Sequence, residues 1–234
     1  MSEIVRVNFG APMPLFPLPE AVLLPHAVQP LQIFEPRYSK MISDCLDTSG
    51  QIAMATFASA HGMRCCAPPS HKIRPAVCIG HIVKHESLPD GCHNILLHGL
   101  CRARITHTIE SEADRPYRMV KLSPIEPLQD EPPALPHIRS DLKCMLSNPR
   151  LQRMQTISTV MQWVNRKDVP THALLELIGF VLVHDQEVKY RLLEEADILA
   201  RAGIIRTEIR HIDDLIRAAD RQDYRNWPKG MSWN

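Results

Sequence analysis

The sequence predicts an α+β protein with a strand-rich amino-terminal part and a helical carboxyl-terminal part. Proline divides the chain, because 17 of the 20 prolines lie at or before Pro136. Proline disfavours helix interiors and biases the preceding residue toward extended backbone. Residues 77–84 and 94–105 are rich in β-branched and aliphatic residues, whereas apolar residues beyond the prolines recur at helical spacing.

The stretch 13–42 predicts an extended segment that leads into a helix. Its prolines favour strand and turn over 15–30, and Pro36 has the fixed φ that suits a first helical turn. Gly50 can end this helix in a left-handed conformation. The apolar residues at helical spacing between them are Tyr38, Met41, Ile42, Cys45 and Leu46.

A β-hairpin is predicted at the runs 77–84 and 94–105, because Leu-Pro-Asp-Gly at 88–91 separates them. Proline presets φ in such a turn, and glycine tolerates a positive φ. Residues 117–122 predict a further short strand, and residues 1–9 predict an edge strand.

Four helices are predicted beyond the prolines. The first follows Asn148 and Pro149, a cap and a first-turn proline, and the second covers the apolar positions of 174–182. Asp185 and Asp197 are expected to cap the third and the fourth. The apolar residues at helical spacing in the first and last are Leu151, Met154, Ile157, Met161, Val164, Ile198, Ile205, Ile209, Ile212 and Ile216.

Segment 124–136 holds five prolines mixed with acidic residues and predicts the junction between two subdomains. In this interpretation, residues 1–123 form the β-rich subdomain and residues 137–219 form the helical bundle. Residues 220–234 are polar with two tryptophans and predict a loose tail.

The bulk composition is that of an ordinary globular protein, with 44% hydrophobic and 23% charged residues. A net charge of +1 argues against a general nucleic-acid binder, and no apolar run approaches the ~18 residues of a membrane span. The amino terminus lacks the regions of a signal peptide, and seven cysteines is an odd number. We therefore expect a cytoplasmic protein with free thiols, without membrane contact and without a nucleic-acid partner.

Residues 33–38 read Ile-Phe-Glu-Pro-Arg-Tyr, and Pro-Leu-Phe-Pro-Leu precedes them at 14–18. Together they resemble the opening of the substrate-binding amino-terminal domain of Lon proteases. The likeness continues through Gly-His-Ile-Val-Lys-His-Glu at 80–86 and Leu-Val-His-Asp at 182–185, and it covers roughly 14–215. It implies a small PUA-like β-barrel with one helix, followed by a helical bundle.

Full Lon proteases continue into an ATPase and a serine–lysine protease, but this sequence has no Gly-x4-Gly-Lys-Ser/Thr phosphate loop. It therefore resembles the stand-alone Lon-domain proteins, and we expect no enzyme activity and no cofactor. The resemblance implies a domain that recognises unfolded or apolar polypeptide, or an adaptor for proteolysis or quality control. The expected partner is a polypeptide substrate or a partner protein, and a homo-oligomer stays open. The alternatives are a PUA-like module for a small molecule or RNA and a His/Cys metal-dependent enzyme.

Twelve histidines raise the question of a metal site, although none is predicted. There is no Cys-x2-Cys pair, and on a strand His81 and His85 lie about 13 Å apart, too far to share an ion. His85 begins a pattern like that of a zincin helix, but Pro89 occupies the position of the second histidine. The loop 58–69 keeps the metal alternative open through a group close in sequence, which is His61, Cys65, Cys66 and His71.

No catalytic residue is predicted either, since the Gly-x-Ser-x-Gly motif is absent. Cys45 on the apolar face of its helix and Cys78 in a strand are expected in the core. Glu86 and Asp90 lie at a hairpin end, where carboxylates are usually solvated.

The candidate binding residues lie at the corner between the extended segment and the first helix and are Phe34, Glu35, Arg37 and Tyr38. We favour a structural role, in which Phe34 and Tyr38 pack the barrel against its helix and the two charged residues pair with charges or caps. If Phe34 is in the core, its replacement by alanine should cost roughly 3–5 kcal/mol. The alternative is that this corner borders a groove for extended polypeptide.

Overall fold

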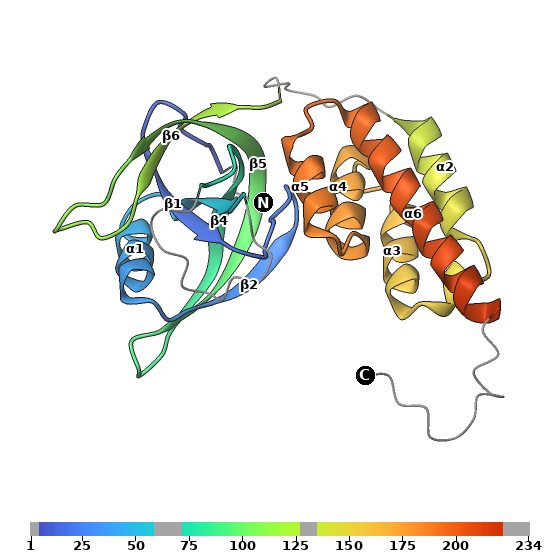
Figure 1. The fold of residues 1–234 in the computed structure, drawn as a ribbon, viewed down its shortest axis with the longest axis horizontal. Helices are drawn as coiled ribbons and strands as arrows, with labels where there is room; N and C mark the ends of the chain where they lie inside the picture. Colours follow the sequence, from blue (N-terminus) through green and yellow to red (C-terminus); the bar gives the residue numbers. More distant parts are fainter. Residues whose placement is uncertain (1–4, 59–71, 127–134, 222–234) are drawn as a thin grey trace.

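The computed structural model describes residues 5–58, 72–126 and 135–221. Within these ranges it is a mixed α+β structure, in which a six-stranded sheet and helix α1 (Pro36–Leu46) lie beside five further helices (Figure 1). The strands are β1 Met13–Leu18, β2 Val28–Ile33, β3 Gln51–Thr56, β4 Ala76–Ser87, β5 His93–Ile109 and β6 Met119–Pro124. The further helices are α2 Pro136–Leu146, α3 Gln155–Asn165, α4 Thr171–Leu182, α5 Gln186–Glu194 and α6 Ile198–Arg221. No helix of the described residues is long and apolar enough to cross a membrane.

The strands pair in the order β2-β5-β4-β3-β1-β6, and β6 also pairs with β5. The series of pairs that begins at β5 therefore passes through β4, β3, β1 and β6 and ends at β5 again. β2 pairs with β5 alone. β1 and β3 are parallel, and the remaining pairs are antiparallel. β5 has 17 residues, which lets its first part pair with β2 and its last part with β6.

The predicted hairpin and the predicted first helix are both confirmed. Gly91 has a φ of 79° in the turn between β4 and β5, and its amide donates to the carbonyl of Leu88 over 3.1 Å. Pro36 occupies the first turn of α1, and Gly50 follows the helix with a φ of 64°. The amide of Gly50 donates to the carbonyl of Cys45 over 2.9 Å. Local rules for turns and caps account for both features.

The later helices match the prediction at α5 and α6 but not at α3. The Asp185 carboxylate accepts hydrogen bonds from two amides of the first turn of α5, over 2.7 and 3.1 Å, and Asp197 accepts one from the first turn of α6 over 3.0 Å. The helix predicted to follow Pro149 begins later. A 3₁₀ turn covers Leu151–Arg153, and Met154 is then extended, with φ −83° and ψ 126°, before α3 begins.

Two elements, β3 and α2, have no counterpart in the predicted set. All six residues of β3 are buried, so the strand lacks the alternation that reveals a half-buried strand in a sequence.

The edge strand predicted over 1–9 is absent from residues 5–9, and residues 1–4 lie outside the described ranges. There the carbonyl of Arg6 accepts a hydrogen bond from the side chain of Gln51 over 2.8 Å.

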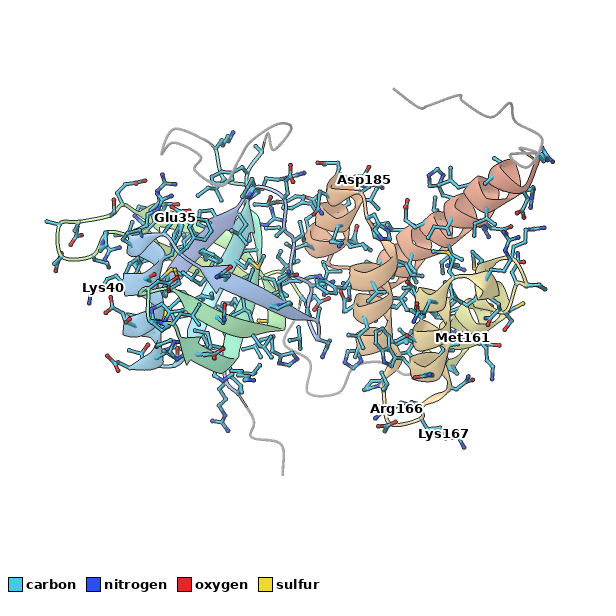
Figure 2. All side chains as sticks on the ribbon, turned by 90° about the horizontal axis from the view of Figure 1, so that it is seen from below. Glu35, Lys40, Met161, Arg166, Lys167 and Asp185 are labelled. Atoms are coloured by element: carbon cyan, nitrogen blue, oxygen red, sulfur yellow. The ribbon has the colours of Figure 1, made fainter. Side chains whose placement is uncertain are left out.

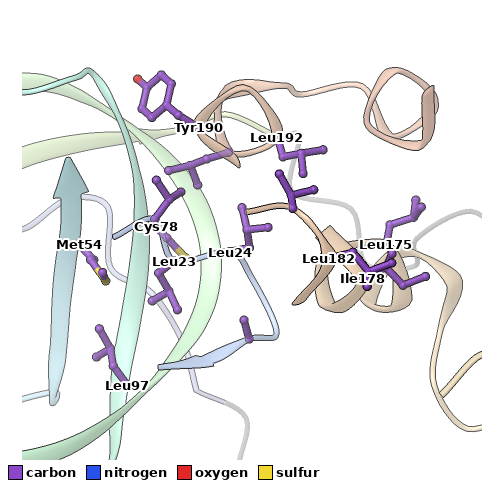
Figure 3. Packing of buried hydrophobic residues seen from close by; sticks show 14 of the residues in the cluster. Leu23, Leu24, Met54, Cys78, Leu97, Leu175, Ile178, Leu182, Tyr190 and Leu192 are labelled. Atoms are coloured by element: carbon purple, nitrogen blue, oxygen red, sulfur yellow. The ribbon is translucent and has the colours of Figure 1, made fainter. Parts of the chain in front are cut away.

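Two hydrophobic clusters form the core. The smaller one lies among the five strands β1, β3, β4, β5 and β6. It consists of Met13, Leu15, Ala53, Ala55, Val77, Ile79, Ala103, Val120 and Leu122. The larger one runs without a break from α1 and the sheet into the helices. Figure 3 shows Leu23 and Leu24 between the strand residues Cys78 and Leu97 and the helical residue Ile178. The sheet and the helices therefore share buried apolar surface.

A buried network of charges also joins the sheet to the helices. Arg102 of β5 donates to Glu176 of α4 and, over 3.1 Å, to Glu126. Arg201 of α6 lies 2.5 Å from Glu126 and 3.1 Å from Glu176. The side chains of Arg102, Glu176 and Arg201 are only 1%, 4% and 5% exposed. Burial raises the pKa of the Glu176 carboxyl, and the two guanidinium groups oppose that rise.

Helix α5 makes a further tie to the start of β4. The Tyr190 hydroxyl accepts a hydrogen bond from the amide of Ala76 over 2.9 Å. The guanidinium of Arg74 lies over the Tyr190 ring, 3.5 Å from its centroid, and also pairs with Glu187 over 2.5 and 2.8 Å. These contacts fix α5 against the start of β4, and the β4–β5 hairpin lies at the far end of these strands.

Candidate functional site

The structure divides the predicted corner into a buried and an exposed part. Tyr38 is buried as predicted, and its ring meets Phe16 of β1 edge to face, with centroids 4.8 Å apart. Phe34 is 54% exposed, so the prediction that it packs in the core is wrong. Ile33 ends β2 with its side chain in the core, and the next residue of an extended chain projects to the opposite side.

Glu35 and Arg37 pair with each other, as predicted for charged residues with a structural role. The Nε and Nη2 atoms of Arg37 donate to one carboxylate oxygen of Glu35 over 2.9 and 2.7 Å. The same guanidinium lies 4.6 Å from the centroid of the Tyr38 ring. Partly exposed ion pairs of this kind add little stability. With both charges engaged in this pair, Phe34 is the most exposed of the four candidate residues of the corner.

Phe34 continues a row of exposed side chains along β2. Val28, Pro30 and Gln32 are exposed, whereas the side chains between them turn inward and end at the buried Ile33. This alternation is that of a strand with one solvated face. β2 is also an edge strand, since it pairs with β5 alone.

The same solvated face continues onto β5 and β4. Two cross-strand rows follow from the register: Pro30, Leu96 and Lys84 in the first, and Gln32, Asn94 and Glu86 in the second. Directly paired residues lie on one side of a sheet and contact each other. We call this surface the β2 face, and it consists of Val28, Pro30, Gln32, Lys84, Glu86, Asn94 and Leu96.

A hollow of about 320 Å³ lies on the β2 face. Leu31 and Ile95 line it together with the two rows of residues, so that half of its lining residues are apolar and half are polar. A concave apolar surface with a few polar groups is typical of binding sites. The volume lies near the lower end of the range for ligand pockets, about 300–1,000 Å³.

Lys84 and Glu86 are the charged residues of this hollow, and Glu86 is exposed as predicted. The Glu86 carboxylate accepts a hydrogen bond from the side-chain amide of Asn94 over 3.5 Å. Within the described residues, the ammonium group of Lys84 forms no hydrogen bond and no ion pair. It is therefore available to a negatively charged group of a ligand.

A group of histidines lies where β2 begins. The ring of His26 meets that of His172 of α4, with centroids 5.3 Å apart. His26 has a φ of 63°, and its amide donates to the carbonyl of Gly99 over 2.8 Å. Burial, followed by the charges of His172, His98 and Arg102, lowers the pKa of His26 to about 4. Arg102 belongs to the buried network, so the charge of that network also acts on His26.

We expect the protein to lose stability as the pH falls from about 6.5 to about 4. The pKa of His26 drops from 6.5 to about 4 on folding, so within this window the unfolded chain binds a proton that the folded protein does not. The loss in unfolding free energy should reach about 3 kcal/mol. Urea unfolding at about pH 7.5, 5.5 and 4.5 measures it.

His26→Asn is the matched variant, because asparagine tolerates a positive φ and does not titrate. Its unfolding free energy should vary less over the same pH window. A residual dependence is expected from His98 and His172, since burial lowers the pKa of both. A variant that loses as much stability on acidification as the parent protein would contradict the assignment to His26.

Among the described residues, no group of three or more His, Cys, Asp or Glu side chains is placed to hold a metal ion. His85 instead contacts His93, with their ring nitrogens 2.8 Å apart. The candidate ligands His61, Cys65, Cys66 and His71 lie outside the described residues. Cys45 and Cys78 are buried as predicted, and burial raises the pKa of both thiols.

Sequence reasoning found Phe34 but missed the rest of the β2 face. Val-Gln-Pro-Leu-Gln-Ile at 28–33 does alternate between outward and inward positions, which is the signal for a half-buried strand. Pro30 obscures it, because proline argues against a strand unless that strand lies at an edge. Lys84 and Leu96 join the β2 face only through the register of β2, β5 and β4. No local sequence pattern predicts that register.

Comparisons with known proteins settle the family. The family model described as "ATP-dependent protease La (LON) substrate-binding domain" matches residues 12–211. The chain belongs to this family. Its fold is similar to the "N terminal domain of Mycobacterium avium complex Lon protease", with a TM-score of 0.63 and 17% identity over 85% of this chain and 98% of that one. It is also similar to a Lon N-terminal domain protein from Xanthomonas campestris, with a TM-score of 0.56 and 20% identity over 82% of this chain and 95% of that one. No curated protein matches the chain.

The Lon-family match confirms the resemblance found in the sequence. Its residues 12–211 include all of β2, β4 and β5, and with them the β2 face and Phe34. The matched family is a substrate-binding domain, so the chain has a substrate-binding role at the level of its family. Identities of 17% and 20% to the solved structures show a common fold, and the surface of this Lon-family chain determines which ligand it binds.

Proposed function

We propose that this Lon-family domain binds unfolded or apolar polypeptide segments on the β2 face, with Phe34 at one end of the site. The observation that carries the proposal is the row of exposed side chains along β2, in which Val28, Pro30 and Phe34 are apolar and Gln32 is polar, beside a hollow of about 320 Å³. Exposed apolar side chains next to a concave site are typical of surfaces that bind other molecules.

In this proposal the domain holds polypeptide without chemical change, either as a substrate-binding module or as an adaptor for proteolysis or quality control. The strands β5, β4, β3, β1 and β6 act as a PUA-like barrel that carries β2 as an outer strand. The helices, attached through the charge network at Arg102, act as a rigid support. The free thiols of Cys45, Cys78, Cys92, Cys101 and Cys144 are in keeping with the reducing cytoplasm.

Phe34→Ala should leave the free energy of unfolding within about 0.5 kcal/mol of the parent value, because the ring is exposed in the folded protein. The same change should weaken the binding of an unfolded protein about tenfold, because the ring would be buried only in the complex. Urea unfolding measures stability. Fluorescence anisotropy with labelled, reduced and carboxymethylated α-lactalbumin measures binding to a chain that stays unfolded.

Leu215→Ala is the matched control, because Leu215 is 56% exposed against 54% for Phe34. Leu215 lies in the second half of α6, which Figure 1 places far from β2. This variant should keep the parent affinity. The proposal is wrong if the parent protein does not bind the unfolded probe, or if Phe34→Ala binds it as tightly as the parent does.

A further inference from the structure

The edge of β2 is poorly suited to bind a long polypeptide as an added strand. Strand addition depends on a run of main-chain hydrogen bonds along a free edge. Pro30 lies in the middle of the six residues of β2 and has no N–H group to donate. Within sheets, proline occurs at edges where its nitrogen faces solvent. A bound segment is therefore expected to be recognised through side chains that contact the β2 face.

The size of the hollow limits what those side chains can be. About 320 Å³ suits one or two large side chains and is small for a larger ligand. Pro30 and Leu96 supply apolar surface on the β2 face that a leucine or an aromatic side chain of the bound segment would cover. One bulky apolar residue can thus anchor the segment.

The charges of the hollow are not equivalent. The carboxylate of Glu86 already accepts from Asn94, whereas the Lys84 ammonium has no partner among the described residues. Gln32 and Asn94 add side-chain amide donors in the neighbouring row. The surface therefore offers an unused positive charge and further donors to a carboxylate that comes close to Lys84.

The register gives the spacing between the anchor and this charge. Pro30, Leu96 and Lys84 lie in one cross-strand row, and neighbouring strands are about 4.8 Å apart. Successive side chains on one side of an extended segment are about 6.6 Å apart. For a segment that runs across the strands, a side chain seated between Pro30 and Leu96 therefore has its next same-side neighbour within reach of Lys84.

Resting on the proposed function, we infer that the β2 face prefers extended polypeptide segments with a bulky apolar residue and an acidic residue two positions apart. The apolar side chain occupies the hollow, and the carboxylate pairs with Lys84. The amide side chains of Gln32 and Asn94 hydrogen-bond the segment beside it. Phe34 extends the apolar contact at the end of β2.

Three fluorescein-labelled peptides of about eleven residues test this preference. They share a polar background and differ in one three-residue motif, which is Phe-Ser-Glu, Phe-Ser-Gln or Phe-Ser-Lys. The parent protein should bind the glutamate peptide about threefold to tenfold more tightly than the lysine peptide, with the glutamine peptide between them. The preference should shrink at high salt, because exposed charges are screened.

Charge-reversal variants assign the preference to Lys84. Lys84→Glu should reverse the order of the peptides, and Glu86→Lys should increase the preference for the glutamate peptide. Lys167→Glu makes the same charge change in the helical part, where Figure 2 shows Lys167 far from Glu35, and it should keep the parent order. Circular dichroism checks that each variant is folded.

The outcomes separate the inference from the proposed function. If the glutamate and lysine peptides bind equally well, or if the order survives in Lys84→Glu, the inference is wrong. The proposed function still stands in that case, provided that Phe34→Ala weakens the binding of unfolded α-lactalbumin. If the unfolded protein binds and none of the peptides does, recognition of a short motif is overturned. If nothing binds, the proposed function itself fails.

Discussion

Glu176→Gln is expected to lower the free energy of unfolding by about 3–5 kcal/mol, a large share of the ~5–15 kcal/mol that a domain has. The carboxylate is 4% exposed and faces two buried guanidinium groups, those of Arg102 and Arg201. Glutamine preserves the size of the side chain and removes its charge. The variant leaves two positive charges that share only the partly exposed Glu126. Urea unfolding measures the difference.

Asp168→Asn is the matched control, because Asp168 pairs with Arg166 at 2.5 Å but is 65% exposed. Removing this charge should change stability by less than about 1 kcal/mol, since water screens exposed pairs. A combined Arg102→Met, Glu176→Leu and Arg201→Met variant should recover much of the stability lost in Glu176→Gln, because it leaves fewer unpaired buried charges. Equal effects of Glu176→Gln and Asp168→Asn would contradict the role assigned to burial.

Gly99→Ala should destabilise the protein by more than about 4 kcal/mol or prevent folding. A Cβ atom at this position would lie 2.2 Å from the carbonyl oxygen of Leu24 and 3.2 Å from Sγ of Cys78. The backbone cannot move away easily, because Gly99 exchanges hydrogen bonds with His26 and Ala27 over 2.8 and 2.9 Å. Leu24 is itself fully buried in the core shared by the sheet and the helices.

Gly203→Ala is the control for the glycine-to-alanine change. A Cβ atom at Gly203 in α6 meets nothing within 4 Å, and alanine is the better helix former by about 1 kcal/mol. This variant should be slightly more stable than the parent protein. Thermal unfolding followed by circular dichroism compares the two. A Gly99→Ala protein that melts within a few degrees of the parent would contradict the close packing of Leu24 on β5.

The parts of the fold that could be predicted are those that local chemistry controls. The turn with Gly91, the start of α1 at Pro36 and the caps at Asp185 and Asp197 each depend on a few adjacent residues. The start of α3 could not be predicted in this way. Met154 fits the helical spacing of the apolar residues around it, although its backbone is extended.

Long-range contacts limit what could be predicted of the site. Phe34 is aromatic and lies beside the buried Ile33, so composition favours the core, and only the alternation along β2 places it in solvent. The polar part of the site depends on a register that brings Lys84 beside Leu96. The buried charge network is harder still, because Arg102 and Glu176 are 74 positions apart in the sequence.

Pro30 also bears on whether the edge of β2 can pair with a second copy of this chain. A flat edge strand with free N–H and C=O groups is a template on which identical chains stack into aggregates. Pro30 removes one N–H group at the centre of β2, between the exposed Val28 and Phe34, and so weakens that template. The same proline that disfavours an added strand therefore also disfavours pairing between copies of the chain at this edge.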